Sequence, residues 1–220
     1  MRYIYFLFGT VFIVFGIYTA GIYLDLYGEL EGPGYSINSE LPKSLVDQKL
    51  ISQKPFGREK QILFGDTHVH TTYSTDAFLW SLPILNGEGP HPIADACDFA
   101  RFCANLDFWV STDHAEALTP RKWKSIKEAV RNCNSPTDAN DPDLVTFLGY
   151  EWTQVGNTAE THYGHKNVMF LDIEEGKVPE RAIGAGGLAT TGMRAGIPGQ
   201  SRQLRPAALL DFENRHRYFD

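Results

Sequence analysis

Histidines and carboxylates follow several short apolar segments in this sequence. The stretch LFGDTHVHTTYSTDAF, residues 63–78, places His68 and His70 two positions apart, with Asp76 just downstream. On an extended strand, residues two positions apart point to the same face, so the two imidazoles are predicted to project together. Imidazole is the commonest metal ligand among side chains. The pair alone fits either a metal site or two ordinary hydrogen-bonded histidines.

The elements that would position these groups follow from hydrophobic periodicity. Helices are predicted over residues 93–105 and over residues 121–132, with Pro120 near the start of the second helix. The apolar segments read as strands are residues 61–70, 106–114, 144–153 and 166–172. Strands that alternate with helices indicate parallel βαβ units and an α/β fold.

Aromatic and aliphatic residues suggest where the core lies. Ile62, Leu63 and Phe64 read as the buried part of the first strand. The tryptophans expected in the core or in a pocket wall are Trp80, Trp109 and Trp152.

Metal-type ligands recur where the predicted strands end. In chain order they are His68, His70, Asp76, Asp113, His114, Glu151, His162 and His165. The carboxyl ends of parallel strands lie on one side of a sheet, where ligands gather in α/β folds. These groups are therefore predicted to converge on a metal site. A site with more than one divalent ion suits phosphate-ester hydrolysis, while single-metal deamination or amide hydrolysis stays compatible.

The motifs GDTHVHTTYSTDA, VSTDHAE, GYEWT and GHKNVMF resemble the successive motifs of the polymerase-and-histidinol-phosphatase (PHP) superfamily. More narrowly, they resemble a branch catalogued as a domain of unknown function. The resemblance covers about residues 61–172. It implies the N-terminal part of a distorted (β/α)7 barrel that binds two or three divalent ions, namely zinc, manganese or iron. It also implies hydrolysis of a small phosphorylated substrate by a metal-bound hydroxide.

The resemblance also implies roles for individual residues. The metal ligands carried over by position are His68, His70, Asp76, His114, Glu151 and His165. Glu151 and His114 are the expected catalytic residues, and Glu151 is the expected bridge between ions. His165 is preferred over His162 as a ligand. The carboxylates expected to orient ligating histidines are Asp66 and Asp113, and His91 is expected to be structural.

The superfamily pattern continues with a further histidine or cysteine and an Asp-x-His pair. Beyond residue 172 this sequence has only His216 and no such pair. Residues 61–220 are therefore expected to be a partial domain, with a Gly-rich loop after residue 182 and a last helix over residues 206–219. The alternatives are an amidohydrolase-like reaction on a non-phosphate substrate, and a metal-binding module or truncated relic without turnover.

The N-terminal segment is strongly apolar. Residues 3–24 contain no charged side chain and are long enough as a helix to cross a hydrocarbon core of about 30 Å. Arg2 precedes them and acidic residues follow, which predicts a membrane-anchored chain with a periplasmic or extracellular domain. A signal anchor is favoured over a cleaved signal peptide, which would give a secreted domain, and over a buried helix. Residues 25–60, with frequent Gly and Pro, read as a linker.

Composition limits the class of partner. The formal charge of −7 over 220 residues argues against a nucleic-acid partner, because phosphate binding needs a clustered positive surface. One basic cluster is predicted to be the solvated face of a helix and consists of Arg121, Lys122, Lys124 and Lys127. Three cysteines cannot all pair within one chain. A Cys97–Cys133 disulfide, a Cys103–Cys133 disulfide and free thiols all stay open.

Overall fold

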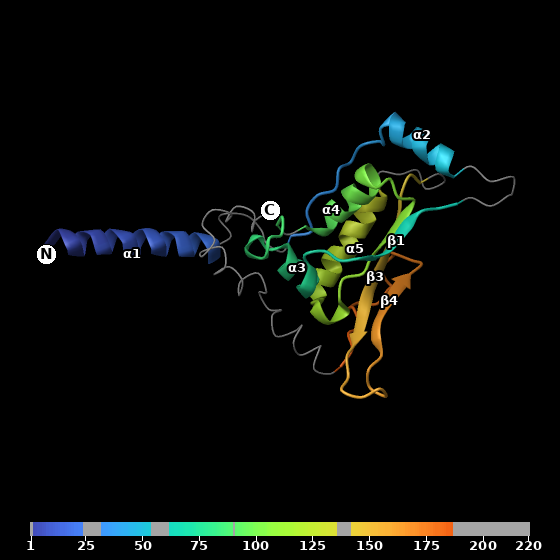
Figure 1. Ribbon diagram of the computed structural model, residues 1–220. Helices are drawn as coiled ribbons and strands as arrows, with labels where there is room; N and C mark the ends of the chain where they lie inside the picture. The colour runs from blue at the N-terminus through green and yellow to red at the C-terminus, as the bar shows by residue number, and fades with distance from the viewer. Residues whose placement is uncertain (1, 24–31, 54–61, 90, 136–141, 187–220) are drawn as a thin grey trace.

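A curled sheet forms the centre of the α/β part of the protein. The computed structural model describes residues 2–23, 32–53, 62–89, 91–135 and 142–186. In this part of the chain the sheet has the order β1 (Gly65–Val69), β2 (Phe108–Ser111), β3 (Val145–Gln154) and β4 (Gly164–Phe170). The first three strands are parallel (Figure 1). The predicted α/β class is confirmed, and β1–β2 and β2–β3 are the predicted βαβ units.

Two helical segments cover one face of this sheet (Figure 1). The first is α4 (Ile93–Asp98), which continues into a π-helical turn, η2 (Phe99–Cys103), and the second is α5 (Pro120–Asn134). Both match the predicted helices. Thr119 caps α5 by accepting a hydrogen bond from the backbone N of Lys122, and Pro120 occupies the first turn. The fully buried face of α5 is formed by Trp123, Ile126, Val130 and Cys133, three or four positions apart.

The opposite face of α5 is less solvated than its charge pattern indicates. Arg121 and Lys124 are exposed, but Lys122 and Lys127 are buried, so the prediction of a fully solvated basic face is wrong for these two lysines. Lys127 Nζ lies 2.7 Å from Glu175 Oε2, because residues after β4 return across the helix. Sequence periodicity within one helix does not reveal a distant segment that covers it.

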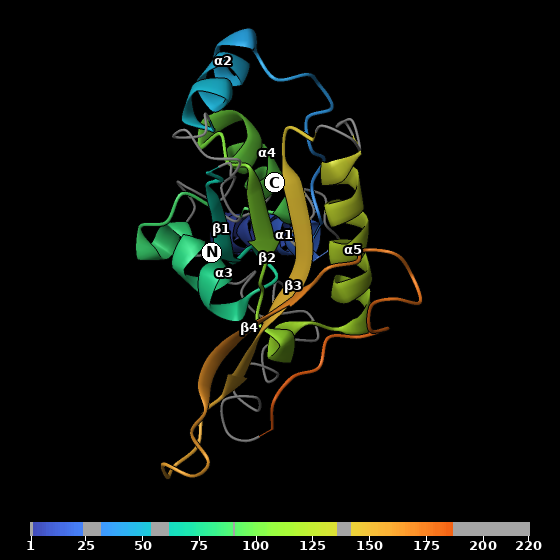
Figure 2. The same cartoon turned by 90° about the vertical axis from the view of Figure 1, so that its right-hand side faces the viewer.

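The strand β4 does not follow the parallel pattern. It runs antiparallel to β3, with Glu151 opposite Asn167 and Thr153 opposite His165. Only residues 155–163 connect the two strands, which is too short for a parallel crossover but sufficient for a hairpin. The hairpin extends beyond the ends of β1 and β2 (Figure 2). The sheet curls enough that Asn167 Nδ2 of β4 donates to the Thr67 carbonyl of β1 at 2.8 Å.

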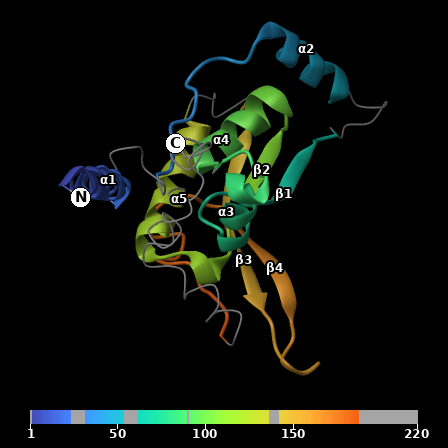
Figure 3. The same cartoon turned by 60° about the vertical axis from the view of Figure 1, so that its left-hand side comes forward.

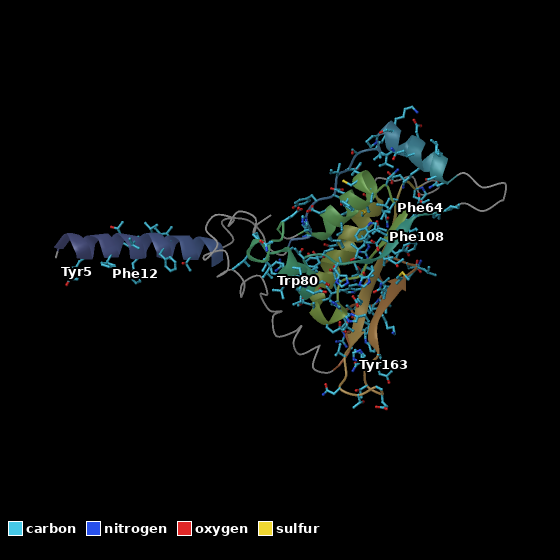
Figure 4. The ribbon with its side chains drawn as sticks, viewed as in Figure 1. Tyr5, Phe12, Phe64, Trp80, Phe108 and Tyr163 are labelled. Carbon is cyan, nitrogen blue, oxygen red and sulfur yellow. A yellow bond between two sulfur atoms is a disulfide. The ribbon has the colours of Figure 1, made fainter. Side chains whose placement is uncertain are left out.

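Two hydrophobic predictions are wrong. Ile62, Leu63 and Phe64 precede β1 and are 40%, 53% and 54% exposed, so they do not form the buried part of a strand; Phe64 is labelled in Figure 4. Trp80 is 73% exposed near the end of α3 (Thr75–Ser81). Trp109, in contrast, is fully buried in the core as predicted. Burial depends on what lies across from a side chain, which an apolar residue type alone does not reveal.

The N-terminal part of the chain contains two helices. Helix α1 (Arg2–Tyr23) lies apart from the sheet (Figure 1). Among the residues that the structure describes, no helix combines the length and the apolar character needed to cross a membrane. Helix α2 (Lys43–Ser52) lies within the predicted linker. The buried Lys49 attaches α2 to the domain, because its Nζ donates to the Leu106 carbonyl at 2.5 Å and lies 3.6 Å from Asp107 Oδ1.

A disulfide joins α4 to α5. Cys97 and Cys133 are bonded, with their Cα atoms 6.0 Å apart, and both are buried. Cys103 is free and exposed. The structure therefore selects one of the three alternatives that the sequence left open. Most of the predicted Gly-rich loop, the last helix over residues 206–219 and His216 lie outside the described residues.

Loss of the disulfide is expected to destabilise the domain. Replacing both Cys97 and Cys133 by alanine is expected to lower the free energy of unfolding by about 2–4 kcal/mol, since the bond constrains the unfolded chain. Urea denaturation of the two proteins measures the difference. Cys103→Ala is the matched control and is expected to leave the midpoint unchanged. Equal midpoints for all three proteins would contradict a stabilising bond.

Candidate metal centre

The end of β1 carries the first two histidines. The pairing of β1 with β2 is irregular between Asp66 and Val69. At this irregularity Asp66 Oδ1 accepts a hydrogen bond from the backbone N of His68 at 2.9 Å. The Nε2 atoms of His68 and His70 lie 2.9 Å apart, so both rings point to one place. His68 is largely exposed, whereas His70 is mostly buried. Asp66 thus orients His68 through its backbone.

The end of β2 is tied to the end of β1. Thr71 donates to Asp113 twice, from its backbone N at 2.6 Å and from its hydroxyl at 2.9 Å. Complete burial raises the pKa of Asp113, although these hydrogen bonds oppose the shift. His114, the next residue, is buried, and its backbone N donates to Ser74 Oγ at 2.8 Å. These contacts fix the position of His114 relative to His70.

Glu151 lies at the centre of the histidines. It belongs to the interior of β3 and not to its end, and it is only 1% exposed. Its backbone N donates to the Asp113 carbonyl at 3.0 Å, which places Glu151 beside His114. Glu151 Oε2 lies 2.8 Å from His70 Nε2, 3.1 Å from His68 Nε2 and 3.7 Å from His114 Nδ1. Glu151 Oε1 contacts His165 Nδ1. One buried carboxylate therefore faces four imidazoles.

Asp76 closes the cluster from the first turn of α3, which lies beside the ends of β1 and β2 (Figure 3). Its Oδ1 lies 3.5 Å from His70 Nδ1 and its Oδ2 lies 3.3 Å from His114 Nε2. Burial favours the protonated Asp76, but the hydrogen bonds with His114 and His70 outweigh it and hold the pKa well below its usual range. Burial likewise opposes charge on His70, but the hydrogen bond with Asp76 and the nearby carboxylates of Asp113 and Glu151 raise the pKa of His70.

All six predicted ligands come together in three overlapping groups. The groups are His68–His70–Glu151, His70–Asp76–His114 and His114–Glu151–His165, and the ligand atoms of each lie within 4.8 Å of one another. Zinc with four ligands at 2.0–2.1 Å holds neighbouring ligand atoms about 3.3 Å apart. The separations of 2.8 and 3.1 Å from Glu151 Oε2 to the Nε2 atoms of His70 and His68 lie close to this value. Imidazole and carboxylate also suit iron and manganese, so the residues fit the predicted ions.

Two other histidines among the described residues lie outside the cluster. His162 is exposed in the connection between β3 and β4 and belongs to none of the three ligand groups. His91 Nδ1 lies 3.4 Å from Asp95 Oδ2 and is exposed. Tyr163, the neighbour of His162, also lies on the hairpin connection (Figure 4).

Sequence reasoning missed Thr153. Its hydroxyl lies 2.9 Å from His114 Nδ1 and 3.2 Å from His165 Nδ1. The available signal was the two-residue period of the strand, which puts Thr153 on the same face as Glu151.

A pocket of about 730 Å3 adjoins the cluster along β1. His68 and His70 form one wall, and Phe99 of η2 and Trp109 contribute apolar surface. The acidic residues among those described around this pocket are Asp66, Glu88 and Asp95, whereas none of its described lining residues is lysine or arginine. The pocket gives a small molecule access to the histidines from the open side of β1.

Part of the chain matches the model of a protein family whose function is unknown. Residues 57–122 match a family model described as "Protein of unknown function (DUF3604)". The matched segment includes His68, His70, Asp76 and His114 and ends before Glu151. No curated protein matches the chain. No solved structure matches it.

Proposed function

We propose that this chain is a metal-dependent hydrolase that acts on phosphate esters and has the PHP type of site. The observation that carries the proposal is the position of Glu151, a buried carboxylate in contact with four imidazoles and shared by two of three overlapping ligand groups. Shared carboxylates are the usual means of holding two ions close together. The motifs around these residues support the PHP type, whereas the family match brings no reaction with it.

The three ligand groups would together hold two or three zinc, manganese or iron ions. Bound there, such ions would supply a water of lowered pKa and would stabilise negative charge on a phosphate ester. Glu151 would be shared between two ions, because its two oxygens face different histidines. His68 faces the pocket and the open side, where an ester can approach. Ser74, Thr71 and Asp113 hold His114 in place.

The first experiment measures hydrolysis of p-nitrophenyl phosphate by metal-depleted protein after addition of Mn2+. We expect turnover that depends on the added ion. His68→Ala is expected to lower kcat/KM by more than about 100-fold, since changes outside the ligands alone cost about 10- to 100-fold. His162→Ala is the matched control, because this exposed histidine belongs to none of the groups, and it is expected to keep full activity.

A parallel panel of amide and lactone substrates separates this proposal from an amidohydrolase-like reaction. Metal-dependent turnover of an amide without turnover of any phosphate ester would overturn the proposed reaction while keeping the metal centre. Equal activity in His68→Ala and the unaltered protein would overturn the assignment of the site.

A further inference from the structure

A hydroxyl group lies between two of the candidate ligands. Thr153 Oγ1 lies 2.9 Å from His114 Nδ1 and 3.2 Å from His165 Nδ1, and Thr153 is buried. The two histidines come from different elements, since His114 follows β2 and His165 belongs to β4. Both histidines belong to the ligand groups, so the hydroxyl contacts two candidate ligands at once.

The backbone of Thr153 is held on two sides. Across the hairpin it pairs with His165. Its N donates to Glu116 Oε1 at 3.1 Å, and the same oxygen accepts from the backbone N of Ala185 at 2.6 Å. Glu116 is also buried. Because burial and these contacts leave little freedom to the strand, the hydroxyl has a defined position before any ion binds.

The contacts of His114 define which of its nitrogens is available. Nδ1 lies within hydrogen-bonding distance of Thr153 Oγ1, whereas Glu151 Oε2 is 3.7 Å away from Nδ1. Nε2 faces Asp76 Oδ2 at 3.3 Å, in the group that also contains His70. A neutral imidazole carries its proton on one nitrogen and its lone pair on the other. An ion held at Nε2 would replace the proton that faces Asp76 and leave the proton of His114 on Nδ1, where Thr153 Oγ1 can accept it.

We propose that Thr153 is a positioning residue for the metal centre. Its hydroxyl oxygen would accept the Nδ1–H of His114 when an ion is held at Nε2, and so fix the ring of His114 with Nε2 directed to the group His70–Asp76–His114. Hydrogen bonds of this kind commonly fix both the tautomer and the ring orientation of a ligating histidine. The inference rests on the metal-binding part of the proposed function and does not depend on the reaction catalysed.

The test compares Thr153→Val, which keeps the shape and removes the hydroxyl, with Thr153→Ser, which keeps the hydroxyl. Zinc affinity is measured by competition with a chromophoric chelator. We expect Thr153→Val to weaken one zinc site by about 10- to 100-fold, whereas Thr153→Ser stays near the unaltered protein. NMR of the zinc-bound protein gives a second readout. The Nδ1 proton of His114 should exchange slowly with solvent in the unaltered protein and the serine variant, and faster in the valine variant, which lacks the acceptor.

Three results would overturn the inference. One is an unchanged exchange rate of the His114 Nδ1 proton in zinc-bound Thr153→Val. Another is unchanged zinc affinity in that variant, and the third is an equal loss in the serine and valine variants, which indicates a packing role alone. If the unaltered protein binds no zinc or manganese, the metal centre and this inference fail together. Loss of hydrolysis with zinc still bound leaves both readouts intact, so failure of the proposed reaction is distinguishable from failure of this inference.

Discussion

Glu151→Gln is expected to weaken zinc or manganese binding by more than about 100-fold at each group that contains Glu151, and to abolish metal-dependent hydrolysis. Glutamine has nearly the same shape as glutamate but lacks the negative charge that faces four imidazoles. Zinc is bound by cysteine, histidine and carboxylate ligands, and a neutral amide oxygen compensates less of the charge of zinc or manganese than a carboxylate does. Metal content after dialysis, measured by atomic emission, and p-nitrophenyl phosphate turnover give the two readouts.

The same substitution is expected to have a different effect on the metal-free protein. Burial of a carboxylate is costly unless a cation compensates it, and Glu151 is 1% exposed. At a pH where the histidines are neutral, Glu151→Gln should therefore leave the melting temperature of the metal-free protein unchanged or raise it. Glu128→Gln, a change at an exposed carboxylate outside the cluster, is the matched control. A Glu151→Gln protein that retains its metal after dialysis would contradict the central role of this carboxylate.

The sequence predicts the members of the cluster better than the geometry that unites them. The reasoning from strand ends applies to His70 and to His114, which directly follow or lie close to the ends of parallel strands. It does not apply to Glu151, which lies inside β3 because that strand continues beyond its parallel neighbours. His165 reaches the site from an antiparallel strand, since the short connection after β3 forms a hairpin. Spacing along the chain identifies a metal-type residue, but only the pairing register shows what it faces.

Contacts between elements explain the other differences. Periodicity predicts α4 and α5, but it contains no information on which residues of the two helices meet, so the Cys97–Cys133 pairing stayed open. Lys127 is buried because Glu175, 48 positions away, folds back over the helix. Phe64 is exposed because its neighbours in space, and not its residue type, determine its burial. Local patterns thus predict elements, whereas burial and pairing require the tertiary arrangement.

Acidification is expected to stabilise the metal-free protein and to destabilise the metal-bound protein. The pKa of His70 is raised above its ordinary value of 6.5, because Asp76 and neighbouring carboxylates outweigh the effect of burial. The stabilisation from charged His70 is therefore fully present below pH 6.5 and is lost as the pH rises through the raised pKa. The pKa of Asp76 is lowered, so its contribution is present above the ordinary value of 3.8 and is lost as the pH falls toward the lowered pKa. Without metal, these two groups stabilise the fold most between pH 3.8 and pH 6.5.

Metal binding has the opposite requirement, because His70 must lose its proton to become a ligand. Below the pKa of His70, affinity at its groups is expected to fall about tenfold for each pH unit. Melting temperatures measured from pH 5 to pH 8.5, with and without zinc, should therefore converge as the pH falls, since zinc stabilises only the deprotonated site. His70→Gln should remove this part of the pH dependence from the metal-free protein. If the metal-free protein instead gains stability as the pH rises above 6.5, Asp76 and Glu151 do not hold a charged His70, and the electrostatic account of the cluster is wrong.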